Sequence, residues 1–181
     1  TKSLKISKKK VIISIGESRK LTCRRLPSGS KDKISWSSKR PSIVTVDSAG
    51  RLKARNVGTT TVTARTSRGV KASCKVIVCP SYVKNGWLQN SKNGKILHNQ
   101  LLITWKKVKK SDGYEIQIAT DKKFSRNVLK KAVRSRKTTS CRFTRLKKGR
   151  GYYLRMRTYK TVGNSTYYSA WVSTSSAVYV K

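Results

Sequence analysis

Acidic residues are scarce in this chain of 181 residues: there are 6 Asp and Glu, against 44 Lys and Arg, and a single His. General acid–base catalysis and glycoside hydrolysis need paired carboxylates or a tuned acid–base couple. Asp112 and Glu115 are three residues apart at the start of a predicted strand, so we expect their side chains to leave on different faces. The remaining acids are Glu17, Asp32, Asp47 and Asp121. We therefore predict a chain that is not an enzyme and has no catalytic residues.

Motifs that hold metals, cofactors or membranes are also missing. The four cysteines include no Cys-x-x-Cys, and His98 is the one histidine, so no zinc site is indicated and we expect no cofactor and no metal ligands. There is no Gly-x-Ser-x-Gly and no phosphate-binding glycine loop. No apolar run approaches the roughly 20 residues that cross a bilayer, so we expect no membrane insertion.

Basic residues are abundant along the whole chain. Residues 1–79 contain 20 basic and 3 acidic residues (20 − 3 = +17), and residues 80–181 contain 24 and 3 (24 − 3 = +21). A body this basic attracts polyanions, which is the favoured interpretation. The alternative is a compositional habit, since lysine runs also blunt sheet edges against aggregation. The candidate polyanion contacts are Lys8, Lys9, Lys10, Lys106, Lys107, Lys109, Lys110, Arg145, Lys147, Lys148 and Arg150.

Short runs of alternating apolar residues recur about every ten residues, which predicts an all-β protein. The predicted strands are Leu4–Ser7, Val11–Ile15, Arg19–Arg24, Lys33–Ser37, Ile43–Val46, Arg51–Ala54, Thr59–Arg65, Ala72–Val78, Gln100–Lys106, Gly113–Ala119, Ser140–Thr144, Tyr152–Thr161 and Ser176–Val180. The opening strand of the second half is poorly marked near Val83–Leu88, and an atypical loop over Asn85–Asn99 is the alternative. The length suits two small cores, and Pro80 ends a strand, so we predict domains at 1–79 and 80–181, each an immunoglobulin-like β-sandwich.

Three aromatic residues are assigned to the core. Trp36 shares strand parity with Ile34, and Trp105 shares it with Ile103, so both indoles should point inward. Tyr152 opens a late strand where a tyrosine corner belongs, with its hydroxyl bonded back to the backbone. Trp87, Tyr153, Tyr167 and Tyr168 are the aromatic residues that we expect to be exposed.

The cysteines leave alternatives open. Cys23 and Cys74 both have inward parity, so they form either a disulfide across the first core or two buried thiols. Cys141 is expected to be a small buried hydrophobe, and Cys79 lies at the domain boundary with outward parity. A bond between Cys79 and Cys141 is the less favoured alternative.

The first half resembles the bacterial Ig-like domain of group 2. The ordered elements that carry this resemblance are Ile34-Ser35-Trp36-Ser37-Ser38, Ser42-Ile43-Val44-Thr45-Val46-Asp47, Gly50-Arg51-Leu52 and Val57-Gly58-Thr59-Thr60-Thr61-Val62-Thr63-Ala64. The second half is similar to a fibronectin type III domain. Its elements are Ile103-Thr104-Trp105-Lys106-Lys107-Val108, Gly113-Tyr114-Glu115-Ile116-Gln117-Ile118, Leu146 to Arg157 and Tyr168-Ser169-Ala170-Trp171.

The two resemblances imply a secreted or cell-surface protein, as in surface proteins of Gram-positive gut anaerobes. We expect a non-catalytic interaction or spacer segment with diffuse affinity for an anionic cell-wall polymer or acidic glycan. The alternatives are an accessory C-terminal region of a secreted hydrolase and an adhesin module that binds a protein ligand. Nucleic acid is expected to bind only non-specifically, because Trp36, Trp105 and Tyr114 have core parity and the aromatic residues expected to be exposed are equally suited to contact protein or sugar.

Overall fold

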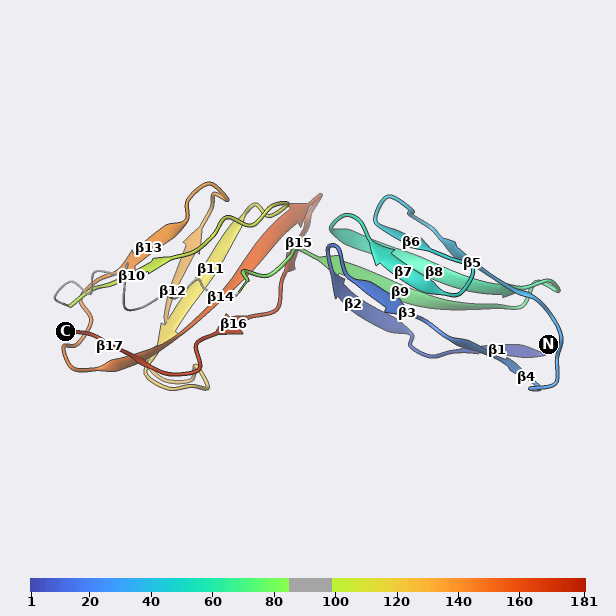
Figure 1. Ribbon diagram of the computed structural model, residues 1–181, viewed down its shortest axis with the longest axis horizontal. Coiled ribbons are helices and arrows are strands. Elements are labelled where there is room, and N and C mark those ends of the chain that lie inside the picture. Colours follow the sequence, from blue (N-terminus) through green and yellow to red (C-terminus); the bar gives the residue numbers. More distant parts are fainter. Residues whose placement is uncertain (85–98) are drawn as a thin grey trace. The chain divides into compact units, whose positions relative to one another are not determined.

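The computed structural model describes residues 1–84 and 99–181. All secondary-structure elements within these residues are β-strands. Contacts divide the chain into two compact units, Thr1–Cys79 and Pro80–Lys181 (Figure 1). The prediction of an all-β protein is therefore confirmed. Trp87, His98 and the part of the predicted strand Val83–Leu88 beyond Lys84 lie outside the described residues.

The first unit contains a four-stranded sheet and a three-stranded sheet, with a separate two-stranded ribbon. The four-stranded sheet has the order β2-β9-β8-β5, in which β2 runs parallel to β9 and the other pairs are antiparallel. The three-stranded sheet has the order β3-β7-β6, and β1 pairs with β4. The strands are β1 (Ser3–Ile6), β2 (Lys10–Ser14), β3 (Ser18–Lys20), β4 (Cys23–Leu26), β5 (Ile34–Ser38), β6 (Val44–Val46), β7 (Arg51–Ala54), β8 (Gly58–Thr66) and β9 (Lys71–Cys79).

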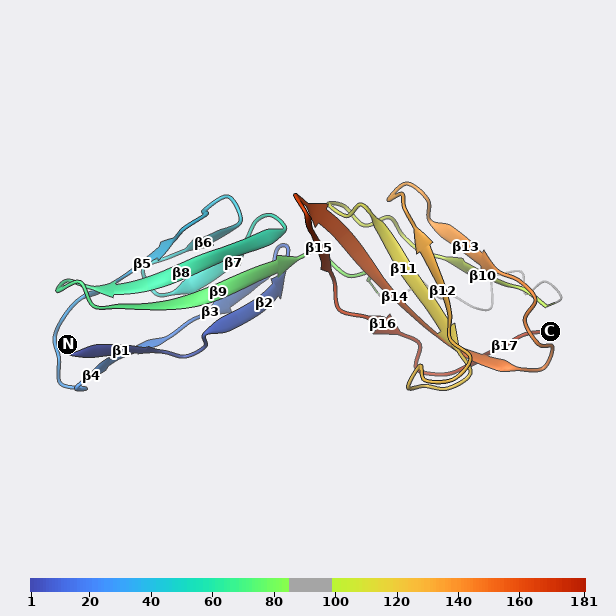
Figure 2. The same ribbon diagram turned by 180° about the vertical axis from the view of Figure 1, so that it is seen from behind.

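The core of the first unit follows from strand alternation. Cys74, Val76 and Val78 on β9 are fully buried, whereas Lys71, Ser73 and Lys75 on the same strand are exposed. The long β8–β9 pair runs through the middle of this unit (Figure 2). Trp36 is half-buried and packs against this core.

One predicted strand of the first unit is wrong in its extent. Residues Arg19–Arg24 form two strands, β3 and β4, which pair with different partners. The break lies at Leu21, whose N–H donates to Gly50 O at 2.9 Å and whose side chain is buried. Gly50 has φ +77°, and a Cβ there would lie 2.5 Å from Leu21 O, so this close approach requires glycine.

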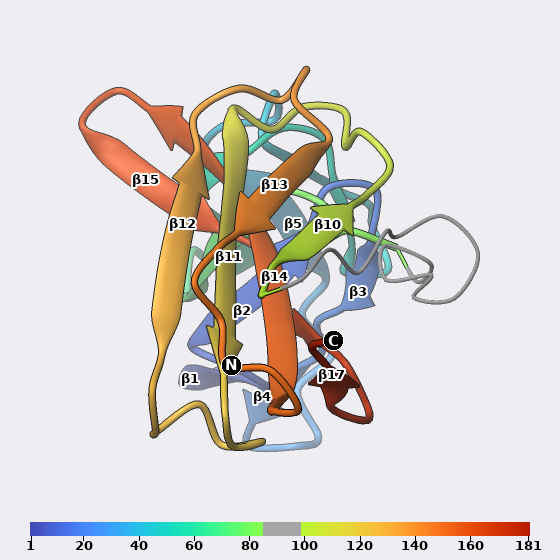
Figure 3. The ribbon, with the colours of Figure 1, turned by 90° about the vertical axis from the view of Figure 1, so that its left-hand side faces the viewer.

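The second unit has a large antiparallel sheet and a two-stranded partner. The sheet has the order β12-β11-β14-β15, and β16 and β17 also pair with β14. β10 pairs with β13. The strands are β10 (Leu101–Thr104), β11 (Gly113–Ala119), β12 (Leu129–Val133), β13 (Ser140–Phe143), β14 (Gly151–Val162), β15 (Ser165–Tyr168), β16 (Val172–Ser173) and β17 (Val178–Tyr179). Figure 3 shows β12, β11 and β14 side by side, with the β14–β15 hairpin reaching beyond them.

Three strands of the second unit escaped the sequence prediction. β12 is an edge strand in which Leu129, Lys130, Lys131 and Ala132 are all exposed, so no alternating pattern marks it. β15 follows a tight turn at Gly163-Asn164, a hairpin signal that alternation alone does not reveal. β16 has only two residues.

Tyr114 and Trp105 form an edge-to-face pair in the second core, with ring centroids 5.0 Å apart. Tyr152 is buried, and its hydroxyl accepts a hydrogen bond from the Lys147 N–H at 3.2 Å. This bond holds the turn before β14 against the core, as a tyrosine corner does.

Candidate functional site

The six carboxylates are all engaged within their own units. Asp47 accepts the N–H groups of the turn that Gly50 closes, and Asp121 accepts three N–H groups of its loop. Asp32 is paired with Arg68 at 3.3 Å, Asp112 with Lys160 at 3.1 Å and Glu115 with Arg157 at 2.6 Å. Glu17 accepts the Ser14 N–H at 3.0 Å. These carboxylates stabilise turns and strands, and six of them cannot neutralise 44 cations.

Burial acts to raise the pKa of Asp112, but hydrogen bonds from Thr161 and Lys160, together with nearby positive charge, outweigh it. The pKa of Asp112 therefore lies below its usual range. The carboxylate stays ionised and holds the Thr161 N–H at 2.8 Å. This group fastens the end of β14 and is engaged as a structural acceptor.

The predicted polyanion contacts are all exposed, but they are spread over both units. Lys8 and Lys9 precede β2, and Lys10 is its first residue. The four lysines between 106 and 110 lie on the connection from β10 to β11. These groups do not converge on a common pocket among the described residues.

Three of the remaining predicted contacts do come together. Arg145, Lys147 and Arg150, on the connection from β13 to β14, line a hollow of ≈ 300 Å³ beside Tyr152, while Lys148 lies on the same connection. Arg145 has φ +58°, and the Tyr152 hydroxyl holds this turn in place. The hollow is a basic concavity on the turn before β14.

The disulfide between Cys23 and Cys74 that the sequence left open is not formed, and neither is the alternative between Cys79 and Cys141. Cys23 belongs to β4, which pairs with β1, whereas Cys74 lies within the four-stranded sheet. All four cysteines are free thiols, and burial raises the pKa of each. For Cys141 burial raises the pKa to about 11, against the opposing charge of Lys131.

The outward side of the four-stranded sheet in the first unit carries cations that directly face other cations. Lys10 on β2 is opposite Lys75 on β9, and Lys71 on β9 is opposite Arg65 on β8. Thr63 and Ser73 lie opposite one another between the two pairs, with their hydroxyl oxygens 3.0 Å apart. We call these six residues, with Thr61 opposite Lys75, the β9 face.

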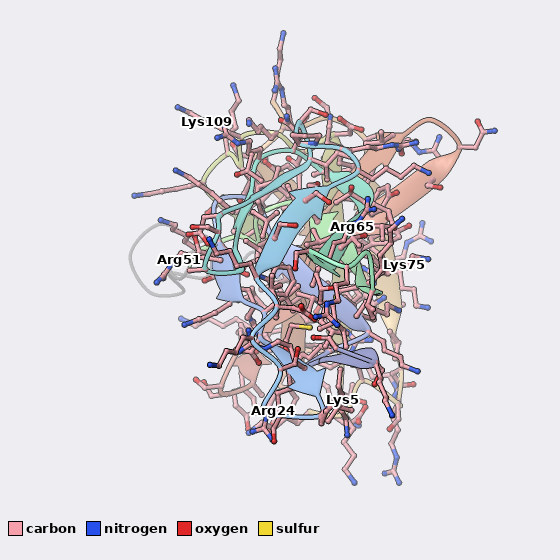
Figure 4. The ribbon with its side chains drawn as sticks, turned by 90° about the vertical axis from the view of Figure 1, so that its right-hand side faces the viewer. Lys5, Arg24, Arg51, Arg65, Lys75 and Lys109 are labelled. Carbon is pink, nitrogen blue, oxygen red and sulfur yellow. The ribbon has the colours of Figure 1, made fainter. Side chains whose placement is uncertain are left out.

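Two more opposed cation pairs lie elsewhere on the first unit. Lys5 faces Arg24 across β1 and β4, and Lys20 faces Arg51 across β3 and β7. Figure 4 shows Lys5 and Arg24 together at one end, and Arg65 and Lys75 along one side. Like charges directly opposite one another on paired strands are destabilising, so the first unit has four such positions.

The outward side of the large sheet in the second unit has the opposite arrangement. Arg155 on β14 faces Gln117 on β11, and both its Nε and one terminal nitrogen donate to Gln117 Oε1, at 2.9 and 2.7 Å. Arg157 faces Glu115 and donates to Oε2 in the same way, at 2.8 and 2.6 Å. Gln117 Nε2 donates to Glu115 Oε1 at 3.1 Å, which joins the two pairs.

Aromatic rings cover these two guanidinium groups. Arg155 lies 4.3 Å from the Phe124 ring and 4.5 Å from Trp171, and Arg157 lies 4.4 Å from Trp171 and 3.9 Å from Tyr168. Burial and the adjacent charge of Arg157 lower the pKa of Arg155, while Glu115 acts in the opposite sense. We call these five side chains, with Glu115 and Gln117, the ladder.

A groove follows one side of the ladder. Lys130, Arg134 and Arg157 line it together with Tyr159 and the 40% exposed Tyr168. The Lys131 ammonium, by contrast, donates to Arg142 O and lies over the Phe143 ring. The groove is therefore lined by basic side chains, of which Arg157 is already bound to Glu115.

Sequence reasoning missed both the β9 face and the ladder. Neither site forms a run of neighbouring basic residues: Lys71 and Lys75 are isolated in the sequence, and Arg155 and Arg157 alternate with buried Leu154 and Met156. The signal that was available is parity, because outward positions of one strand recur every second residue. To know which residue on the neighbouring strand faces each of them, one also needs the pairing register of the strands.

Among residues 1–84 and 99–181 no three His, Cys, Asp or Glu side chains gather in a way that would hold a metal ion. The described part of the chain also contains no helix long and apolar enough to span a membrane.

Comparison with known families separates the two units. Residues 1–76 match the model of the Bacterial Ig-like domain (group 2), and residues 91–175 match that of the Fibronectin type III domain. Both kinds of domain are typical of extracellular or surface proteins and are generally non-catalytic. The order of the two domains is the order that the sequence predicted.

A curated relative is the minor capsid protein of Enterobacteria phage T3, with 45% identity over 73 residues, which is 40% of this chain. The chain spans 17% of the length of that relative. Among solved structures, a two-domain fibronectin type III segment of chicken tenascin has 12% identity and a TM-score of 0.52, covering 99% of this chain and 98% of that one. This likeness shows the sandwich fold.

The structure of the intimin–Tir90 complex matches 44% of this chain and 48% of its own chain, with 27% identity and a TM-score of 0.36.

Proposed function

We propose that this chain, whose two parts match the group 2 bacterial Ig-like domain and the fibronectin type III domain, is a non-catalytic interaction and spacer segment of a secreted or cell-surface bacterial protein. In this proposal its cations hold it, by diffuse electrostatic attraction, to an anionic envelope polymer or an acidic glycan. A polymer of the Gram-positive cell wall, such as teichoic acid, is the partner that we expect.

The observation that carries this proposal is the engagement of all six carboxylates in turns and ion pairs. Because these acids serve the fold, at least 44 − 6 = 38 cationic charges have no carboxylate of this chain to neutralise them. Exposed lysine and arginine side chains collect counterions, and a polyanion that replaces these ions releases them to solution. Association by this mechanism needs many exposed cations and no single pocket, which is the distribution seen here.

The proposed spacer role is supported by the architecture. Each unit has its own hydrophobic core, and the described residues of neither unit assemble paired acids or a nucleophile with a base. Sandwich domains in tandem set a distance between the parts of a protein while presenting surface along that distance. An accessory role beside a hydrolase is compatible with the same features, and the full-length gene distinguishes the two.

A second candidate is suggested by the 45% identity to the phage minor capsid protein. In that case the domain pair is displayed on a virus particle, and its cations attract the particle to an anionic bacterial surface. The neighbouring genes and the rest of the protein decide between a cellular and a viral origin. The chemistry of the attraction is the same in both cases.

Binding of the purified chain to isolated Gram-positive cell walls, before and after chemical removal of teichoic acid, tests the proposal over a series of salt concentrations. We expect binding that falls steeply as salt rises and that is largely lost with the polymer. Binding that is independent of salt, or absent at physiological ionic strength, would contradict electrostatic wall association.

A further inference from the structure

The β9 face is a place where the fold leaves positive charges against one another. Lys10 and Lys75 are directly opposite, as are Lys71 and Arg65, and none of these four side chains has a carboxylate partner among the ion pairs of the described residues. Neighbouring strands lie about 4.8 Å apart, so the two cations of a pair can contact one anionic group. An oxyanion between them would replace repulsion by two charge-assisted hydrogen bonds.

The two pairs are spaced along one strand. Lys71 and Lys75 are four residues apart on β9, which corresponds to about 13 Å between their Cα atoms. Arg65 and Thr61 have the same spacing on β8. The β9 face therefore offers two anion positions in line, which suits a linear polymer with repeated charges better than a single small anion.

Hydroxyl groups fill the space between the pairs. Thr63 and Ser73 lie directly between them, and Thr61 lies beside Lys75, with Thr61 and Thr63 half-exposed and Ser73 exposed. Hydroxyls of this kind donate to and accept from the hydroxyls of a sugar or polyol chain. The apolar side chains Ile12 and Ile77 continue this side of the sheet beyond Lys10 and Lys75.

The chemistry of the β9 face disfavours nucleic acid as its ligand. Its seven residues include no aromatic side chain on which a base would stack. In the second unit, where aromatic rings do lie on the outward sheet, Trp171 lies within 4.5 Å of two guanidinium groups. A polymer of sugars or polyols, which needs hydroxyl partners more than rings, fits this face better.

We propose that the β9 face binds one strand of a linear sugar or polyol polymer that carries phosphate or sulfate groups, with Lys10–Lys75 and Arg65–Lys71 as two anion-binding pairs. This inference rests on the proposed polyanion affinity and assigns it a place. The other cations of the chain contribute attraction at longer range, and the β9 face contributes the ordered contacts. Binding there stabilises the first unit, because the ligand removes the repulsion that the unliganded sheet contains.

The test compares two double variants of equal charge in the complete chain. Lys71→Gln with Lys75→Gln removes one cation from each pair, and Lys31→Gln with Lys53→Gln removes two exposed cations, with Lys53 opposite Ser18 and Thr45. Affinity is measured by calorimetry for size-fractionated dextran sulfate and for poly(glycerol phosphate) teichoic acid, each over a salt series. A single-stranded DNA oligonucleotide is the third probe.

We expect the β9-face variant to lose about tenfold in affinity for at least one of the two polymers and to lower the salt slope by about 2, whereas the control loses about twofold. The probe that shows the larger difference identifies sulfate or phosphate as the anion. For DNA we expect both variants to lose affinity equally. Lys71→Arg with Lys75→Arg should retain binding. This outcome would show that positive charge at these positions, and not the lysine side chain itself, is what binding needs.

Equal losses in the two double variants would overturn the β9-face proposal while leaving the diffuse polyanion affinity intact. A β9-face variant that loses affinity for DNA more than for either polymer would also overturn it. If the wild-type chain binds neither polymer at physiological salt, the proposed function itself fails. Thermal unfolding of the unliganded β9-face variant, expected to be at least as stable as wild type, controls for damage to the fold.

Discussion

The two units of this protein carry a similar excess of cations on the same kind of sandwich, yet their outward sheets place these cations against different neighbours. In the first unit Lys10 faces Lys75, and Lys71 faces Arg65. In the second, Arg157 faces Glu115, and Arg155 faces Gln117, with aromatic rings over both guanidinium groups.

The difference indicates that cations in similar excess can either be packed into the fold or remain exposed on the surface. A guanidinium between aromatic rings and fixed oxygens is part of the packing, and removing it costs stability. A lysine opposite another lysine weakens the sheet slightly, and its charge remains available to the surroundings. Charge therefore contributes to folding in the second unit, and in our proposal it serves recognition in the first.

The largest loss of stability is expected at Gly113, where β11 packs closely against the backbone and side chains of its neighbours in the second unit. A Cβ at Gly113 would lie 2.1 Å from Val133 O and 2.7 Å from the Tyr159 hydroxyl, and the backbone oxygen cannot move aside. Gly113→Ala should destabilise this unit by about 3 kcal/mol or more. Denaturant unfolding, with hydrogen exchange to separate the two units, measures the change.

Gly29→Ala is the matched control for that substitution. A Cβ at Gly29 meets no atom within 4 Å, so a change within about 0.5 kcal/mol is expected. Comparable losses in both variants would show that the closely packed sheet of the second unit is not the reason for the effect at Gly113.

Removal of the Glu115 carboxylate tests whether the ladder is a stabilising network. Glu115→Ala leaves the half-buried Arg157 guanidinium and the Gln117 amide without their acceptor, and we expect a loss of about 2 kcal/mol. In the first unit Lys5→Gln relieves the repulsion with Arg24 and should stabilise by a few tenths, about 0.3 kcal/mol. The same sign of change in both units would contradict the comparison.

Replacing an arginine by lysine tests whether the planar shape of the guanidinium group, or only its charge, contributes to stability. Arg155→Lys keeps the charge but loses the planar group that contacts Phe124, Trp171 and Gln117, so a cost of about 1 kcal/mol is expected. Arg65→Lys, on the exposed β9 face, should change stability by less than about 0.5 kcal/mol. Thermal unfolding of both variants, beside wild type, provides the measurement.

Acid is expected to weaken the second unit through Asp112. Because hydrogen bonds and positive charge hold the pKa of Asp112 below its unfolded value, the stability that it contributes is present above that unfolded value of 3.8. This contribution is lost as pH falls through the folded-state pKa. Asp112→Asn should therefore flatten the acid limb of unfolding measured between about pH 6 and pH 2. An unchanged acid limb would show that other groups dominate.

Much of the fold could be predicted from local pattern. Residues Gly113 to Ala119 and Lys71 to Cys79 alternate clearly, and the Asp47 turn with Gly50 has the side chain and the glycine that such a turn needs. Leu129 to Val133 could not be recognised, because an exposed edge strand has no buried side to impose a pattern. The split at Leu21 escaped for another reason, since it depends on Gly50, which lies 29 residues further along.

The candidate sites were predictable only in part. The sequence by itself determined the cation excess, the all-β class, the order of the two domains and the inward positions of Trp105 and Tyr152. Only the tertiary structure decided which outward residues meet: Lys10 and Lys75 are 65 residues apart, and a register shift of one residue would turn every side chain of one strand to the other side of the sheet. The register is set by burial of Val11, Ile13, Val76 and Val78, so the apolar core determines which charges face each other on the surface.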